Sequence, residues 1–202
     1  MTGRVASIDP LRPDDTTLGE AAAILRAGGV VAFPTETFYG LGAAALNRAA
    51  VDRVFALKGR PRSSPLLVLV DSVAMAERIG DVTGTARSLM ARHWPGALTL
   101  VLRARPVVPL EVTASTATVG VRLSSHVVAR ELVRVLGDPI TAPSANVTGE
   151  APPRTAAEVL RYFGDAIDLV LDGGETPGGL PSTVLDVSVD PPRLIRAGAI
   201  TL

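Results

Sequence analysis

Three cations fall within five residues of the chain, in the segment KGRPRSSPL at residues 58–66. Lys58 is the single lysine among 20 basic residues, and Arg60 and Arg62 follow it closely. A compact ammonium suits one phosphate or carboxylate oxygen, while guanidinium groups hold such anions through paired hydrogen bonds. The cluster therefore favours a polyphosphate site. The alternative is a helix-capping role, because a cation in the last helical turn interacts favourably with the helix dipole.

A second polar segment, PTETFYGLG at residues 34–42, directly follows a predicted buried strand. The ends of strands are where α/β folds place their ligands. The segment carries three hydroxyl groups and the carboxylate of Glu36. The equally weighted alternative is an ordinary strand-to-helix loop, in which Gly40 and Gly42 are expected at tight turns.

Two later segments resemble the second in chemistry. APSANVTG at residues 142–149 offers Ser144 and Asn146 as hydrogen-bonding groups, with a plain turn as the alternative. DGGETPGGLPST at residues 172–183 is rich in glycine and proline, and its backbone N–H groups are suited to holding anions. A surface loop is the competing interpretation of that segment.

Several catalytic signatures are missing from the sequence. There is no P-loop pattern, no nucleophile elbow and no cysteine to pair with a histidine. His93 and His126 are the only histidines, and their separation matches no metal-ligand spacing, so we expect both to be structural. Chemistry here must then depend on positioning and electrostatics rather than on a protein nucleophile.

Helical and strand patterns alternate along the chain, which predicts one α/β domain with a mixed sheet. A capping box at Thr17 and Glu20 predicts a helix that stops at Gly28. Further helices are expected at about 47–59 with Asn47 as cap, 73–79, 85–94, 124–136 with Ser124 or Ser125 as cap and, from a second capping box at Thr155 and Glu158, 155–164. Strands are expected at 30–33, 66–70, 97–102, 119–123, 140–143, 168–172, 183–188 and 193–198.

Composition narrows the class of protein. The 202 residues fit a single domain over 1–202, and 47% hydrophobic residues suffice for a core. The lack of cysteine and of any apolar run long enough for a bilayer predicts a cytoplasmic protein without membrane contact. A net charge of zero argues against a dedicated nucleic-acid binder.

Seven segments, in order, resemble the YrdC-like family, whose bacterial single-domain members are threonylcarbamoyl-AMP synthases. The segments are PTETFYGLG, KGRPRSSPLLVLV, HWPGALTLVL, VGVRL, APSANVTG, LPSTVLD and LIRAG, and they cover residues 20–198 approximately. The resemblance implies an α/β fold, an open twisted mixed sheet with helices on both faces around a deep cleft. It also implies an adenylate made from L-threonine, bicarbonate or CO2, and ATP, with release of pyrophosphate.

The resemblance also assigns roles to individual residues. Lys58 and Arg60 are expected to be catalytic. The ATP-binding residues are expected to be Lys58, Arg62, Thr118, Ser144, Asn146 and Arg196. The threonine-binding residues are expected to be Thr35, Arg122, Ala142 and Ser182. Tyr39 is expected to line a wall of the cleft, and Leu69 stands where many relatives have histidine.

The implied partners follow from that reaction. Mg2+ is expected to arrive with ATP and to be held mainly by the substrate, with no organic cofactor. A downstream tRNA threonylcarbamoyl transferase complex would use the product for t6A at position 37 of tRNA. Two alternatives share the fold: a module that binds double-stranded RNA, tRNA or the ribosome, and the carbamoyl-adenylate domain of a hydrogenase-maturation protein.

Overall fold

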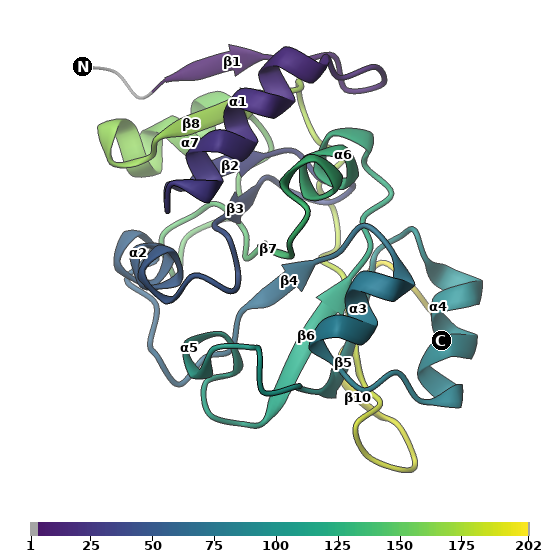
Figure 1. The fold of residues 1–202 in the computed structure, drawn as a ribbon. Coiled ribbons are helices and arrows are strands. Elements are labelled where there is room, and N and C mark those ends of the chain that lie inside the picture. The colour runs from purple at the N-terminus through teal and green to yellow at the C-terminus, as the bar shows by residue number, and fades with distance from the viewer. Residues whose placement is uncertain (1–3, 202) are drawn as a thin grey trace.

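The computed structural model describes residues 4–201, whose strands form two mixed sheets (Figure 1). The smaller sheet has the order β1-β8-β2-β3, and the larger has the order β10-β9-β5-β6-β4-β7. The strands are β1 (Val5–Ser7), β2 (Val31–Phe33), β3 (Gly40–Gly42), β4 (Leu67–Leu69), β5 (Leu98–Arg103), β6 (Thr118–Arg122), β7 (Ile140–Thr141), β8 (Leu169–Asp172), β9 (Thr183–Asp186) and β10 (Arg193–Arg196). The predicted mixed α/β class is confirmed, although the strands divide between two sheets.

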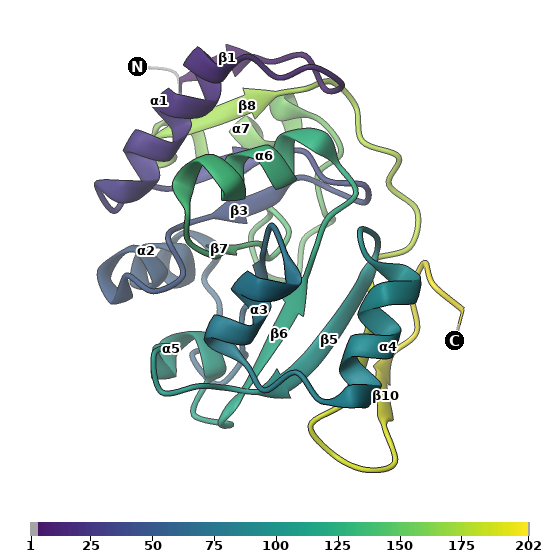
Figure 2. The ribbon, with the colours of Figure 1, turned by 45° about the vertical axis from the view of Figure 1, so that its right-hand side comes forward.

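The helices lie against these sheets. They are α1 (Asp15–Arg26), α2 (Arg48–Lys58), α3 (Val73–Ile79), α4 (Gly84–His93), α5 (Leu110–Thr113), α6 (Val127–Leu136) and α7 (Ala156–Phe163), followed by the 3-10 turn η1 (Gly164–Ala166). Helices α1 and α6 pack against each other beside the smaller sheet, and α7 contacts β8 (Figure 2). None of the helices in the described part of the chain is long and apolar enough to cross a membrane. The single domain predicted over 1–202 stays a prediction, and residues 1–3 and 202 of it lie outside the described residues.

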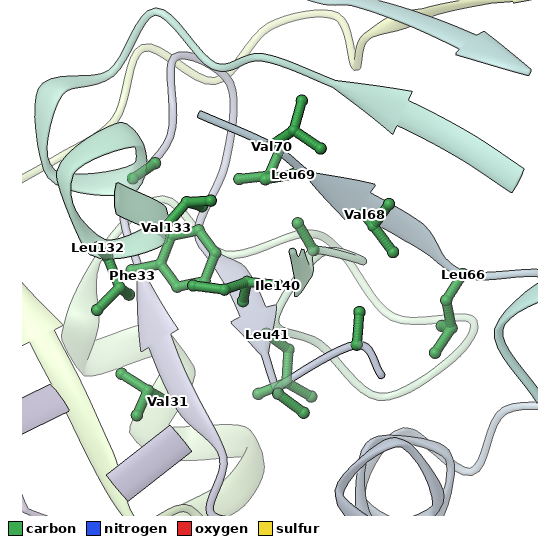
Figure 3. Close-up of a cluster of buried hydrophobic side chains, with 14 of the residues drawn as sticks. Val31, Phe33, Leu41, Leu66, Val68, Leu69, Val70, Leu132, Val133 and Ile140 are labelled. Atoms are coloured by element: carbon green, nitrogen blue, oxygen red, sulfur yellow. The ribbon is translucent and has the colours of Figure 1, made fainter. Parts of the chain in front are cut away.

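Strand β3 joins the two sheets and corrects an expectation about glycine. Gly40 and Gly42, expected at tight turns, pair in antiparallel register with β2 instead. A Cβ on Gly42 would lie 2.6 Å from the ring of Phe33 and 2.8 Å from Ile140 Cγ2. Position 42 therefore requires glycine, because the ring of Phe33 packs directly against its backbone in the core shared by β2, β3 and β7 (Figure 3). A bridge from Gly40 to Ser144 then links this strand to the segment that follows β7.

Two helices begin as their sequences predict. Asn47 caps α2 by accepting from the backbone N–H of Ala50, and the helix ends at Gly59, whose φ of 57° is left-handed. The capping box of α7 is confirmed, because Thr155 and Glu158 each accept from the other's backbone N–H. Both helix starts are therefore encoded locally.

Two other predicted helix starts are wrong. The N-cap of α1 is Asp14, whose carboxylate accepts from the backbone N–H of Thr17 at 2.8 Å, so Thr17 lies inside the helix. The N-cap of α6 is His126, without a side-chain cap bond, in place of the expected Ser124 or Ser125. The hydroxyl of Ser124 is used elsewhere, as described below.

Candidate functional site

Lys58 ends α2 with its side chain buried, only 2% exposed. Its Nζ donates to the backbone carbonyls of Ser144 at 2.5 Å and Asn146 at 2.6 Å. Neither carbonyl belongs to α2, so the contacts of Lys58 are not those of a helix cap. Burial, reinforced by the nearby Arg60, lowers the pKa of Lys58 to about 8. An ammonium has three N–H donors, so two carbonyls leave one bonding direction for a ligand.

Asn146 lies beside Lys58 in a loop held by its own side chain. Its Nδ2 donates to the carbonyls of Val147 at 2.9 Å and Glu150 at 2.8 Å. The backbone N–H of Thr148 donates to the carbonyl of Lys58 at 2.8 Å, which fastens the loop to α2. The Oδ1 of Asn146 is buried without a hydrogen-bond partner among the described residues. This oxygen is therefore available to a ligand's donor group.

The other two cations of the 58–66 segment lie differently. Arg60 is partly buried and donates to the carbonyl of Pro65 at 2.9 Å, and burial lowers its pKa. Arg62 points outward: it pairs with Asp52 at 2.5 Å with a side chain 63% exposed, and it stacks over Phe55 at 5.5 Å. The structure therefore groups Arg60 with Lys58 and holds Arg62 on the outer surface of α2.

Arg122, at the end of β6, is a buried cation, and its side chain is only 4% exposed. Its Nε lies 3.7 Å from Oε1 of Glu36, and neither atom has a hydrogen-bond partner among residues 4–201. The other Glu36 oxygen accepts from the hydroxyl of Ser124. Burial lowers the pKa of Arg122, and the Glu36 carboxylate opposes this shift. An opposite charge thus partly compensates a cation that burial would otherwise make very costly.

Hydroxyl groups and a second arginine surround Arg122. Arg196 in β10 donates to the Ser182 carbonyl at 2.8 Å and to the Ser182 hydroxyl at 3.1 Å. The Ser182 and Thr99 hydroxyls are 2.9 Å apart and both are buried. Burial lowers the pKa of Arg196, and the like charge of Arg122 adds to the shift. Two guanidinium groups close enough to affect each other form a site suited to an anion.

Strand register explains why these residues meet. Leu69 of β4 pairs with Arg122 in parallel register, so the carboxyl ends of both strands reach one edge of the larger sheet. Strand β5 runs antiparallel to β6 and parallel to β9, which brings the first residues of β5 and β9 to the same edge. Thr99 and Ser182 lie there. Leu69 itself is buried in the core (Figure 3).

The segment after β2 contacts both the surroundings of Arg122, through Glu36, and the loop beside Lys58, through the Tyr39 carbonyl, which accepts from the Ala145 N–H. Thr35 is buried, and its hydroxyl donates to the Phe38 carbonyl at 2.6 Å. Tyr39 is fully buried, and its hydroxyl donates to the Gly174 carbonyl at 2.8 Å. The ring of Tyr39 packs in the core, and a place for Tyr39 at a wall of the cleft stays a prediction. Burial, with the nearby Asp172, raises the pKa of Tyr39.

The 172–183 segment is tied down rather than free, since Gly178 N–H also donates to the Thr37 carbonyl at 2.8 Å. Ala142 is buried and donates its N–H to the Leu67 carbonyl at 2.8 Å, next to Ser144. Thr118 begins β6, with its hydroxyl 2.9 Å from that of Thr116. At about 3.3 Å per strand residue, Thr118 lies roughly 13 Å from Arg122. A contact from Thr118 to ATP stays a prediction.

Sequence reasoning gave no role to four residues of this site. The sequence predicts only a carboxylate at Glu36, a helix cap at Ser124, a structural role for His126 and a strand position for Thr99. His126 Nδ1 is buried without a partner among the described residues, and burial lowers the pKa of His126 despite Glu36. Ser124 and His126 follow the carboxyl end of β6, so the strand-end rule applied to β6 would have found them.

Comparison with known proteins shows extensive similarity. The Sua5/YciO/YrdC family model, described as telomere recombination, matches residues 23–198. A threonylcarbamoyl-AMP synthase from Bacillus subtilis (strain 168) is 44% identical over 96% of this chain and 56% of its own. One from Pyrococcus abyssi is 44% identical over 90% of this chain and 54% of its own. The chain thus spans just over half the length of these two relatives. A threonylcarbamoyl-AMP synthase from Thiobacillus denitrificans is 39% identical over 87% of this chain and 92% of its own.

Solved structures agree with the sequence comparison. The crystal structure of Pyrococcus abyssi Sua5 complexed with L-threonine superposes with a TM-score of 0.93 at 42% identity, over 96% of this chain and 57% of that one. Escherichia coli YciO superposes with a TM-score of 0.89 at 26% identity, over 97% of this chain and 96% of that one. The arrangement of two mixed sheets is therefore shared over nearly the whole described chain.

Proposed function

Because the chain belongs to the Sua5/YciO/YrdC family, we propose that it is an L-threonylcarbamoyladenylate synthase. It would join L-threonine, bicarbonate or CO2, and ATP into threonylcarbamoyl-AMP and pyrophosphate. The observation that carries the proposal is the pair of buried cations, Lys58 and Arg122, each with an unused N–H. Buried cations so placed suit a substrate that brings in several anionic groups.

The two groups of cations suit different substrates. Arg122, with the hydroxyl groups near it, suits the carboxylate and the hydroxyl of threonine, and the neighbouring Arg196 keeps its predicted role toward ATP. Lys58 and Arg60 suit phosphate oxygens, and Asn146 Oδ1 suits a donor on the nucleotide. The predicted role of Arg62 toward ATP requires its side chain to leave the exposed ion pair with Asp52. Thr118, at the start of β6, keeps its predicted role toward the nucleotide. The deep cleft between the groups remains part of the proposal.

The proposed chemistry has two steps. The threonine amine captures CO2 or bicarbonate as a carbamate, and a carbamate oxygen then attacks the α-phosphorus of ATP and displaces pyrophosphate. Both steps bring anions together, so Lys58 and Arg60 would act by neutralising the charge that develops at phosphorus. The protein supplies no nucleophile in this scheme.

Mg2+ is proposed to enter on the phosphates of ATP. The part of the chain that the structure describes has no group of three metal-ligating side chains, and the donors of this site are mostly cations and hydroxyls. Coordination by substrate oxygens and water fits that donor set better than a protein cage. When bound, Mg2+ would supply charge neutralisation at the phosphates.

The product sets the proposed biological place of the enzyme. A mixed anhydride of a carbamate and a phosphate is reactive, so we expect a transferase complex to take the threonylcarbamoyl group to tRNA in the cytoplasm, as t6A at position 37. Direct RNA binding is the alternative function. The zero net charge gives it little electrostatic support.

The proposal is tested by incubating the protein with ATP, labelled bicarbonate and L-threonine, and by following pyrophosphate. Release that requires threonine supports the synthase. Absence of release, together with tight RNA binding at physiological salt, supports the RNA-binding alternative instead.

A further inference from the structure

Three buried polar atoms without hydrogen-bond partners gather at the end of β6. They are Glu36 Oε1, Arg122 Nε and His126 Nδ1, out of five such side-chain atoms among the described residues. Leaving a buried polar atom unpaired is energetically costly, so such atoms are uncommon and require an explanation. Their concentration in one place points to a ligand with both donors and acceptors.

The charges of Glu36 and Arg122 lie side by side without bonding each other. Their nearest atoms are 3.7 Å apart, beyond the range of an N–H···O hydrogen bond. Both side chains are nevertheless enclosed, with 15% of Glu36 and 4% of Arg122 exposed. A purely structural ion pair in this environment would close to bonding distance, because each partner gains most from direct contact.

An α-amino acid presents the complementary arrangement. Its carboxylate and its ammonium are attached to the same carbon, so a carboxylate on Arg122 brings the ammonium next to Glu36. An ionised carboxylate only accepts hydrogen bonds, and an ammonium only donates them. Glu36 therefore matches the amine and repels a second carboxylate at that position.

We propose that Glu36 Oε1 accepts a hydrogen bond from the amine of the amino-acid substrate and selects substrates that carry this amine. The inference rests on the proposed function, since it assigns the amine of the same threonine. It also remains consistent after carbamate formation, because the carbamate nitrogen keeps one N–H that donates to Glu36.

Two neighbours hold Glu36 in this role. The Ser124 hydroxyl donates to Oε2 of Glu36, which leaves Oε1 as the free oxygen. The backbone N–H of His126 donates in turn to the Ser124 hydroxyl at 3.2 Å. Ser124 is thus a positioning residue that links the segment after β2 to the start of α6.

The test compares two ligands by calorimetry. One is L-threonine, and the other is (R)-3-hydroxybutanoate, a hydroxy acid in which hydrogen replaces the amine, so that no donor remains at this carbon. Wild-type protein should prefer threonine by at least about ten-fold, the value of a charge-assisted hydrogen bond. Glu36→Gln should lose about ten-fold or more in threonine affinity while its affinity for the hydroxy acid changes by less than about two-fold. Glu77→Gln, an exposed carboxylate paired with Arg87 on α3 and α4, is the matched control.

Three results would overturn the inference. Equal weakening of both ligands in Glu36→Gln would mean that Glu36 only supports the fold of the site. Equal affinity of wild-type protein for both ligands would refute amine recognition even if the variant does not fold. Failure of wild-type protein to bind threonine would refute this inference and the proposed function together. The first two results would refute the inference about Glu36 alone.

Discussion

Replacing Lys58 by methionine separates its functional role from a structural one. Methionine keeps the length of the buried stem, whereas alanine would add a cavity penalty of about 2–5 kcal/mol. Two opposing effects on stability are expected. The fall in the pKa of Lys58 from 10.5 to about 8 corresponds to about 3 kcal/mol of unfavourable charge burial, which methionine relieves. The Ser144 and Asn146 carbonyls lose their donor, at a cost of about 1–3 kcal/mol each.

These effects largely offset each other, so the outcome of Lys58→Met should lie between about 1 kcal/mol of stabilisation and about 3 kcal/mol of destabilisation. Threonine-dependent pyrophosphate release should fall at least about a thousand-fold, because the chain has no other lysine that could bind the phosphates. Urea unfolding and single-turnover synthesis measure the two quantities on the same sample.

Arg26→Met is the matched control for that experiment. Arg26 also donates to two backbone carbonyls, those of Val135 at 2.5 Å and Leu136 at 3.4 Å, but it lies outside the site. It should lose comparable hydrogen bonds and keep its activity. Near-normal synthesis by Lys58→Met would refute the assignment of Lys58 to a reacting anion. Complete unfolding of the variant in buffer would refute the expected balance of the two effects on stability.

Three further outcomes follow from the same geometry. Nucleotide affinity should fall as the pH rises through about 8, because Lys58 then loses the charge that attracts phosphate. Titration calorimetry from pH 6 to pH 9.5 measures this fall. A constant affinity over this range would show that another cation dominates. Arg60→Ala should reduce synthesis far more than Arg62→Ala. The exposed ion pair of Arg62 with Asp52 contributes at most about 1 kcal/mol to stability, so its loss should leave the fold intact. Equal losses of kcat/KM in the two variants would contradict this ranking. Gly42→Ala should destabilise the fold by about 1–3 kcal/mol through contact with the core, whereas Gly84→Ala, with open space around it, should be nearly neutral in thermal unfolding.

Local signals in the sequence identified much of the fold correctly. The Asn47 cap, the glycine that ends α2 and the capping box at Thr155 are confirmed, because each depends on hydrogen bonds within one turn of a helix. Strands β1 and β3 were not predicted. Strand β1 has three residues and pairs only with the distant strand β8, which no local pattern reveals. Strand β3 pairs with its sequence neighbour β2, but its residues Gly-Leu-Gly lack the pattern of a strand.

The role of glycine in β3 shows the same limit. A glycine in a polar segment suggests a turn, but Gly42 is needed because the ring of Phe33 and a methyl of Ile140 approach its backbone. The burial of Tyr39 was not predictable for a related reason. Its hydroxyl finds the Gly174 carbonyl, 135 residues away, so an aromatic ring in a polar segment becomes a core residue.

The residue types in the sequence identified the cations of the site more reliably than they identified the residues around those cations. Lys58 stood out as the lone lysine, and the structure buries it beside Ser144 and Asn146. The network from Glu36 through Ser124 to His126 was not recognised, because its members are separated by almost 90 residues and meet only through the two sheets.

Identification of the product from isotope-labelled bicarbonate tests the central claim most directly. Purified protein, ATP, L-threonine and 13C-bicarbonate should yield threonylcarbamoyl-AMP carrying one labelled carbon, detected by mass spectrometry, in amounts equal to the pyrophosphate released. Omission of threonine, or the Lys58→Met substitution, should abolish the labelled product. Pyrophosphate release without a labelled adenylate, or no turnover by folded protein with all three substrates, would contradict the proposed function.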